Sequence, residues 1–139
     1  MDLPKVVFSR WTRWADRMIV DGIDAPGVYL LAHFKKPPLG NADPQTREVI
    51  YIGETCDQSL KKRWRQFHRC AFEGKEGHSG GKTYWKIFAD KGGENLFVAV
   101  FPVEELSDEF RPLFIRYVER KTILDYALKW GAAPKCNKR

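Results

Sequence analysis

Two short apolar runs, residues 27–31 and 49–54, are the clearest feature in the distribution of hydrophobic and polar positions. Both are rich in Val, Ile, Leu and Tyr and are bounded by turn-forming residues, which is typical of β-strands. Side chains alternate between the two faces of a strand, so Tyr29 and Tyr51 can each lie on one face with aliphatic residues behind them. The pattern therefore predicts a pair of strands that carries a phenol on each member.

Three further stretches are predicted to be helices, at residues 9–20, 57–69 and about 112–130. The first two have apolar residues three and four positions apart, as an amphipathic helix does, and Ser9 and Asp57 are the expected N-caps. The third has a proline that a first helical turn accepts, and a glycine and a proline follow it as stop signals.

Residues 96–101 are β-branched and aromatic and are predicted to form a third, central strand. Residues 35–44 contain three prolines and are expected to form a long hairpin loop. Residues 74–83 are polar and glycine-rich, and they are also expected to form a loop, whereas the pattern at 84–89 fits a helix or a strand. The loop ends in Gly-Lys-Thr, but Glu76 occupies a position where a P-loop requires glycine, so a P-loop is rejected.

In the helix predicted at 57–69, the apolar stripe lies between two polar side chains of chemical interest. Turning 100° per residue places Leu60, Trp64 and Phe67 on one face and puts Arg63 and His68 on its opposite margins. A side chain on such a margin can reach from a packed helix into a cleft.

The chain of 139 residues has 24 Lys and Arg against 18 Asp and Glu, a net charge of +6 that favours an anionic partner such as nucleic acid. Its size suits one domain, residues 1–139. No run approaches the roughly 20 apolar residues that span a bilayer, and no secretory signal is evident, so a cytoplasmic protein is expected. Three widely spaced cysteines indicate reduced thiols.

The densest positive charge falls on the helix at 57–69. Two interpretations of these basic side chains are open: loose contact with phosphates, or a basic face that is simply solvated. The residues concerned are Lys61, Lys62, Arg65 and Arg69, together with Lys82 farther along the chain.

Glu119 lies among apolar residues on one face of the last predicted helix. A buried carboxylate is costly unless it is paired, hydrogen-bonded or bound to a metal. A salt bridge and a metal ligand are both consistent with the sequence.

Gly27-Val28-Tyr29 and Tyr51-Ile52-Gly53 resemble the two halves of the signature of the GIY-YIG nuclease superfamily. Arg63 matches the position of the arginine that family members use on the scissile phosphate, and Glu119 and Asn137 follow in the family's order. The resemblance covers about residues 26–137 and leaves an N-terminal extension, about residues 5–22, that is expected to be helical.

The resemblance implies a small α+β domain with a central, mainly antiparallel three-stranded sheet flanked by helices. It also implies a Mg²⁺-dependent or Mn²⁺-dependent endonuclease that hydrolyses DNA, with Arg63 on the phosphate, Glu119 as the metal ligand and Asn137 near the active site. A lone carboxylate whose metal shell is completed by water suits Mg²⁺ better than Zn²⁺. DNA is thus the expected partner, and the oligomeric state, monomer or homodimer, is left open.

Phe67 is a departure from the family, which often has a His or Tyr four residues after the arginine. The general base is therefore sought among Tyr51, His68 and His78, with Tyr51 preferred. The insert at 35–44 is a second departure, because the two tyrosine motifs of the family usually lie closer together. A catalytically inactive nucleic-acid-binding module of the same fold is the main alternative, and a structural or protein-binding domain is a third.

Overall fold

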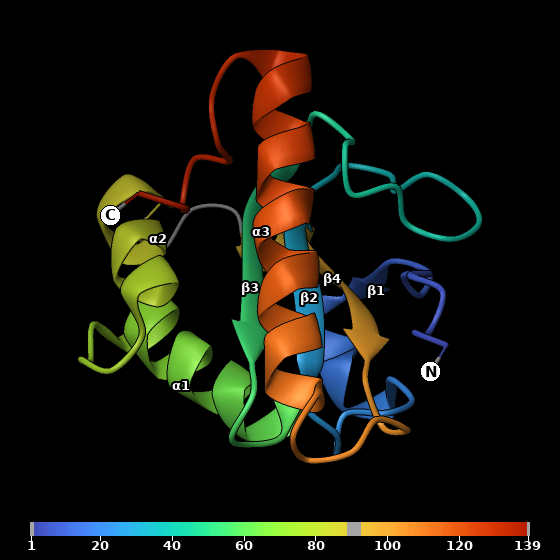
Figure 1. The fold of residues 1–139 in the computed structure, drawn as a ribbon. Helices are drawn as coiled ribbons and strands as arrows, with labels where there is room; N and C mark the ends of the chain where they lie inside the picture. The colour runs from blue at the N-terminus through green and yellow to red at the C-terminus, as the bar shows by residue number, and fades with distance from the viewer. Residues whose placement is uncertain (1, 89–92, 139) are drawn as a thin grey trace.

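Four antiparallel strands form the centre of the computed structural model, which describes residues 2–88 and 93–138 (Figure 1). They lie in the order β1-β4-β2-β3, with the bounds β1 (Thr12–Arg13), β2 (Gly27–His33), β3 (Val49–Thr55) and β4 (Leu96–Pro102). The predicted pairing of the two tyrosine-bearing runs is confirmed, and so is the third strand. The sheet has four strands where three were expected, because the short β1 pairs with the outer side of β4.

The register between β2 and β3 places the two tyrosines on the same face of the sheet. Tyr29 is opposite Gly53 and Leu31 is opposite Tyr51, and the register shifts between Leu31 and Ala32. Because β3 pairs with β2 on one side only, β3 is the edge strand that carries the second motif. The expected long connection between the two strands is present, and the Ala42 amide fastens it by donating to the Ser9 carbonyl at 2.9 Å.

Helices cover both faces of the sheet (Figure 1). On one face α3 (Arg111–Trp130) packs on residues such as Val28, Leu30 and Ala99. On the other face α1 (Leu60–Glu73) and α2 (Ser79–Phe88) pack on a second cluster that includes Tyr29 and Tyr51. The phenols thus lie in the layer between the sheet and α1 with α2, whereas α3 lies across the opposite face.

The amphipathic helix predicted at 9–20 is not formed, and the expected helical N-terminal extension is correct only for a short 3₁₀ helix. The segment forms β1 and then the 3₁₀ helix η1 (Trp14–Ile19). Ser9 does not cap a helix: its amide donates to the Val100 carbonyl at 2.8 Å and its Oγ accepts from the Val100 amide at 2.9 Å. This backbone pairing with β4 holds the chain extended, so its apolar residues bury on both faces of the sheet instead of along one helical stripe.

The helix predicted at 57–69 begins later and ends later, as α1. Its cap is Ser59, whose Oγ accepts from the Lys62 amide at 3.1 Å, and the prediction of Asp57 as N-cap is wrong. The predicted apolar stripe is confirmed, because Leu60, Trp64 and Phe67 are all buried. Gly74 ends the helix with a φ of 67° in the left-handed region, where glycine is favoured.

The prediction of a loop at 74–83 is only half correct, because α2 begins at Ser79. Residues 84–88 are helical, and position 89 of the undecided segment lies outside the described residues. The two glycines at the start of α2 are buried against other elements, and a Cβ at Gly81 would lie 2.9 Å from the Phe67 carbonyl oxygen of α1. Glycine is thus required by close helix packing, and not by a turn.

The long C-terminal helix is confirmed as α3, with Pro112 in its first turn and Gly131 as its C-cap at a φ of 87°. Its buried face includes Ile115, Glu119 and Thr122, as the sequence pattern indicated. Across residues 2–88 and 93–138, no helix has the length and apolar content needed to cross a membrane. All three cysteines are free thiols.

Candidate active site

Tyr29 and Tyr51 form a phenol pair beneath α1 and α2. Their ring centroids are 5.9 Å apart, and the rings are tilted by 53°. Gly53 lies against both rings: a Cβ there would come within 2.7 Å of Tyr29 Cζ and closer still to Tyr51 Cε2. Gly80 of α2 lies against Tyr51 in the same way, with its hypothetical Cβ 2.5 Å from Cζ. The glycine of the second motif is therefore explained by ring packing.

His78 anchors the first phenol. Its Nε2 lies 2.8 Å from Tyr29 Oη, and its Nδ1 accepts a hydrogen bond from the Gly81 amide at 3.0 Å. Because Nδ1 is the acceptor, the neutral ring carries its proton on Nε2 and donates it to the Tyr29 oxygen. Burial, and then the charge of Arg63, lowers the pKa of His78 to about 3, so the ring is neutral near pH 7. His78 thus positions Tyr29 and has no free ring nitrogen to accept a proton.

The Tyr29 phenol stays protonated. It is fully buried, and burial is the main cause that raises its pKa well above the ordinary value. A charge on Tyr51 raises it further, while the charge of Arg63 opposes the shift. A negative charge on Tyr51 therefore disfavours the ionisation of Tyr29. Tyr51, which retains 9% exposure, is the better placed of the two for proton transfer.

Arg63 is held on the margin of α1, half-buried, by polar groups that sequence reasoning did not single out. Its Nη1 donates to Gln66 Oε1 at 2.7 Å and more weakly to the Gly77 carbonyl at 3.5 Å. The Gln66 amide is in turn paired with the Gln58 amide, at 3.0 and 3.2 Å. Gln66 follows Arg63 by three positions, a helical spacing that could have identified it. Gln58 precedes the helix and gave no such signal.

Glu54 is another residue that sequence reasoning missed. It directly follows the Tyr-Ile-Gly motif, and its charge is one of the causes that raise the pKa of Tyr29. Its Oε2 accepts from Cys56 Sγ at 2.9 Å. Burial and this contact raise the pKa of Cys56 to about 12, so the thiol stays protonated beside the carboxylate.

Asn137 binds the outer edge of β3. Its Oδ1 accepts from the Ile52 amide at 2.9 Å, and its Nδ2 donates to the Ile52 carbonyl at 2.8 Å. One residue earlier, the Cys136 amide donates to the Ile50 carbonyl at 2.7 Å. The C-terminal segment thus pairs with the edge of the strand that carries Tyr51, and it places Asn137 beside the second motif.

Glu119 is 7% exposed and lies on the face of α3 that packs toward β2 and β3. Glu119 is therefore on the α3 side of the sheet, opposite the phenol pair. Both α3 and the phenol pair contact the edge strand β3. Within the described ranges, no group of three or more His, Cys, Asp or Glu side chains is arranged to hold a metal ion. Mg²⁺ often uses only one or two carboxylates and keeps several waters, so a single carboxylate such as Glu119 is compatible with that ion.

His68 lies on the other margin of α1, where its Nδ1 accepts from Trp14 Nε1 at 3.0 Å and its ring stacks on the indole. Burial, and then the charge of Arg17, lowers its pKa. The structure therefore gives His68 a packing role against η1, whereas Arg63 is held on the opposite margin.

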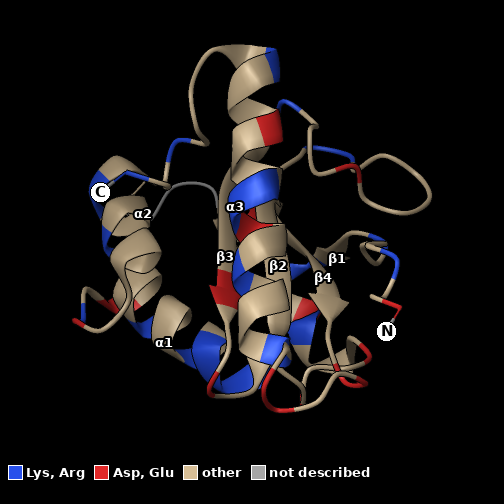
Figure 2. Cartoon of the chain, viewed as in Figure 1, with Lys and Arg blue, Asp and Glu red and all other residues tan. Residues whose placement is uncertain are grey.

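Several basic residues lie on α1 itself (Figure 2). Lys62, Arg65 and Arg69 are exposed and Lys61 is half-exposed, so all four are accessible to a polyanion. Lys82 of α2 is also exposed, and it pairs with Glu76 at 3.3 Å. Such exposed pairs contribute little to stability and can open to a phosphate.

Comparison with known proteins identifies no relative, because no family model, curated protein or solved structure matches the chain. The family membership suggested by the two tripeptides stays a prediction.

Proposed function

We propose that this protein is a metal-dependent endonuclease that hydrolyses phosphodiester bonds in DNA. The observation that carries the proposal is the convergence of Arg63, Tyr29 and Tyr51 in one layer beside an edge strand. A packing cluster would have no need for a guanidinium that is held by Gln66 and whose charge acts on the Tyr29 phenol. A phosphate-cleaving site needs a cation for the phosphate and a group that takes a proton from water.

Arg63 would bind the non-bridging oxygens of the scissile phosphate. A guanidinium suits this role because its donors form a planar fork that stays charged at any physiological pH. The hydrogen bond to Gln66 fixes one side of the fork. Donors held in place in this way need no reorganisation as charge accumulates on the phosphate.

Tyr51 would act as the general base in its phenolate form. Water attacks phosphorus, its proton passes to the Tyr51 oxygen, and the bond from phosphorus to the leaving oxygen breaks as that oxygen takes a proton from solvent. Tyr29 remains protonated, because burial disfavours its charge. Phe67 is fully buried in the core, so the position at which many family members have a titratable group takes no part.

Glu119 would hold Mg²⁺ or Mn²⁺, with waters completing the shell. When bound, such an ion would neutralise charge on the phosphate and lower the pKa of a coordinated water. The carboxylate is nearly buried, on the face of α3 that packs toward β2 and β3.

A catalytically inactive DNA-binding module is the second candidate function. The observation that favours it is that both histidines near α1 use Nδ1 as an acceptor within the protein. If Tyr51 does not act as a base either, the basic residues of α1 would bind DNA and the DNA would not be cleaved.

Incubation of supercoiled plasmid and of branched DNA with the protein in Mg²⁺, Mn²⁺ or EDTA tests the proposal. We expect nicked and linear products with either metal and none in EDTA, and at least a hundredfold lower rate for Arg63→Ala. Binding without cleavage in every metal would support the inactive module. The absence of both binding and cleavage would overturn both functions.

A further inference from the structure

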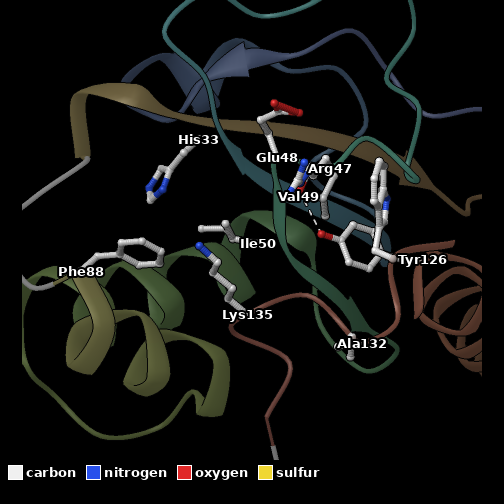
Figure 3. Close-up of a pocket in the computed structure, with 11 residues that line it drawn as sticks. His33, Arg47, Glu48, Val49, Ile50, Phe88, Tyr126, Ala132 and Lys135 are labelled. Atoms are coloured by element: carbon white, nitrogen blue, oxygen red, sulfur yellow. Dashed lines mark hydrogen bonds between the residues drawn. The ribbon is translucent and has the colours of Figure 1, made fainter. Parts of the chain in front are cut away.

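A pocket of about 480 Å³ opens at the start of β3 (Figure 3), and neither Tyr29 nor Tyr51 lines it. It is lined by residues from β2, β3, α2 and α3 and from the segments around them. Its walls combine aromatic rings with cations; the residues that define it are His33, Arg47, Ile50, Phe88, Trp130 and Lys135. Ligand pockets in proteins typically enclose about 300–1,000 Å³ with a few placed polar groups, and this one falls within that range.

Both cations line the pocket, with Lys135 on the side of Phe88 and His33 and Arg47 beside Tyr126 (Figure 3). The ammonium of Lys135 extends toward His33, and its charge contributes, after burial, to lowering the pKa of that imidazole. His33 is therefore a neutral polar group there, with Nε2 2.9 Å from Tyr84 Oη. Glu48 also lines the pocket, but its carboxylate points away from Lys135. The pocket thus offers positive charge from Arg47 and Lys135.

The wall around Arg47 is fixed by contacts with α3. Tyr126 Oη donates to the Arg47 carbonyl at 2.9 Å, and Trp130 Nε1 donates to the Gln45 carbonyl at 2.8 Å. The Arg47 guanidinium lies 5.6 Å from the centroid of the Trp130 ring, a cation–π arrangement that restrains the fork. On the opposite wall, Phe88 packs edge to face on His33 with centroids 4.6 Å apart. Aromatic walls and a restrained guanidinium match a ligand that has a flat ring and a phosphate.

The pocket and the candidate active site lie on the same edge strand. Ile50 lines the pocket, and Gly53 lies against the phenol pair three residues later. With a rise of about 3.3 Å per residue, the two positions are about 10 Å apart along β3. Three stacked nucleotides, at about 3.4 Å each, cover the same length. The segment between them carries Lys135 and Asn137 along the edge of β3.

We propose that this pocket binds one nucleotide of the DNA strand, within about three nucleotides of the bond that is cleaved. Arg47 and Lys135 contact its phosphate, and its base lies among Phe88, Trp130 and His33. The proposal rests on the proposed nuclease function, because it makes the pocket an extension of the same DNA-binding edge.

Binding of a fluorescently labelled 12-nucleotide single strand in EDTA, followed by anisotropy, tests the pocket without cleavage. Arg47→Gln and Lys135→Ala should each weaken binding about fivefold to tenfold and lower the salt slope by about one phosphate contact. Lys86→Ala is the matched control, because Lys86 is exposed on α2 and does not line the pocket, and it should change binding less than twofold. Equal small effects for all three would overturn the subsite.

A strand of the same length that lacks bases separates base binding from phosphate binding. The parent protein should bind the normal strand at least tenfold more tightly than the abasic strand, and Trp130→Ala should narrow that preference at least threefold. An unchanged preference in Trp130→Ala would overturn the base contact, and circular dichroism verifies that the variant is folded. If the parent cleaves plasmid but the pocket variants behave as Lys86→Ala does, only the subsite fails. If the parent neither binds nor cleaves DNA, the proposed function fails as well.

Discussion

His78 Nε2 lies 2.8 Å from Tyr29 Oη, which joins the start of α2 to the middle of the sheet through one hydrogen bond. The other ring nitrogen of His78 is occupied by the Gly81 amide. Protonation of His78 would break one of these two contacts, since an imidazolium can only donate. The neutral ring is therefore part of the folded structure, and stability should depend on its titration.

The free energy of unfolding should fall steeply below pH 6.5. The pKa of His78 is about 3 in the folded protein and about 6.5 in the unfolded chain, so the unfolded chain binds more protons between these values. The contribution is fully present above pH 6.5 and is lost as the pH falls toward 3, by up to about 1.4 kcal/mol per unit. Urea denaturation of the parent and of His78→Gln at pH 7, 6 and 5 measures it. Parallel pH dependences for the parent and His78→Gln would contradict the prediction.

Gly80→Ala should destabilise the protein by about 1–3 kcal/mol, although alanine normally favours a helix over glycine by about 1 kcal/mol. The reason is that the new Cβ would lie 2.5 Å from Tyr51 Cζ. In a Tyr51→Ala background the same change should be neutral or stabilising, because the ring is gone. A double-mutant cycle by urea denaturation gives the coupling energy. Additive effects would show that the ring and the glycine are independent.

Much of the fold follows from local patterns, because those patterns coincide with the tertiary contacts. The stripe of Leu60, Trp64 and Phe67 is buried as its spacing predicts, and that stripe places Arg63 on its margin. The runs around Tyr29 and Tyr51 are β-branched and pair as strands. In these stretches the intrinsic preference and the burial agree.

The wrong predictions fall where contacts with residues far away in the sequence determine the local structure. Ser9 pairs with Val100, more than ninety positions away, so the periodicity of residues 9–20 is overridden by a strand contact. Gly80 lies in a helix, where its missing side chain accommodates the Tyr51 ring, a contact that no local turn pattern reveals. The amide contacts of Asn137 with Ile52 also join residues far apart in sequence. In the site, the positions of Arg63 and the tyrosines follow from sequence, whereas the roles of Gln66 and His78 needed the structure.

Arg63→Ala should lower the DNA cleavage rate by a factor of about 10² to 10³, the usual cost of removing one donor from developing charge. Gln66→Leu removes the acceptor 2.7 Å from Arg63 Nη1 and should lower the cleavage rate less, about tenfold. The guanidinium keeps its charge in this variant but is no longer held in place. Lys62→Ala, on the same helix and exposed, is the control. It should leave the rate at saturating DNA unchanged and reduce the salt slope of binding by about one contact. Equal rate losses in all three variants would show that α1 acts only as a general positively charged surface.

Glu119→Gln should abolish Mg²⁺-dependent cleavage, by at least a hundredfold, while DNA binding in EDTA stays within about twofold. The substitution nearly preserves shape and removes the charge that would hold the ion. Asp125→Asn is the matched control, because Asp125 is the other acidic residue of α3 and pairs with Lys121 at 2.7 Å on the surface. Isothermal calorimetry of Mn²⁺ binding gives a readout separate from activity. A Glu119→Gln variant that cleaves DNA at the parent rate would exclude Glu119 as the metal ligand.

The rate of cleavage should rise with pH from 5.5 to 9.5, by up to tenfold per unit, because a phenol with an ordinary pKa near 10 is the proposed base. A histidine base would give a different profile. His78, with a pKa of about 3, is already deprotonated throughout this range, and the pKa of His68 is lowered as well, so either ring would give a flat rate above pH 6.5. Single-turnover cleavage by the parent and by Tyr51→Phe measures the profile at saturating metal. Tyr51→Phe should lose at least a hundredfold in rate and lose the alkaline rise, whereas His68→Ala should keep the rise. A parent profile that is flat above pH 6.5, with full activity in Tyr51→Phe, would show that the proton goes to another group.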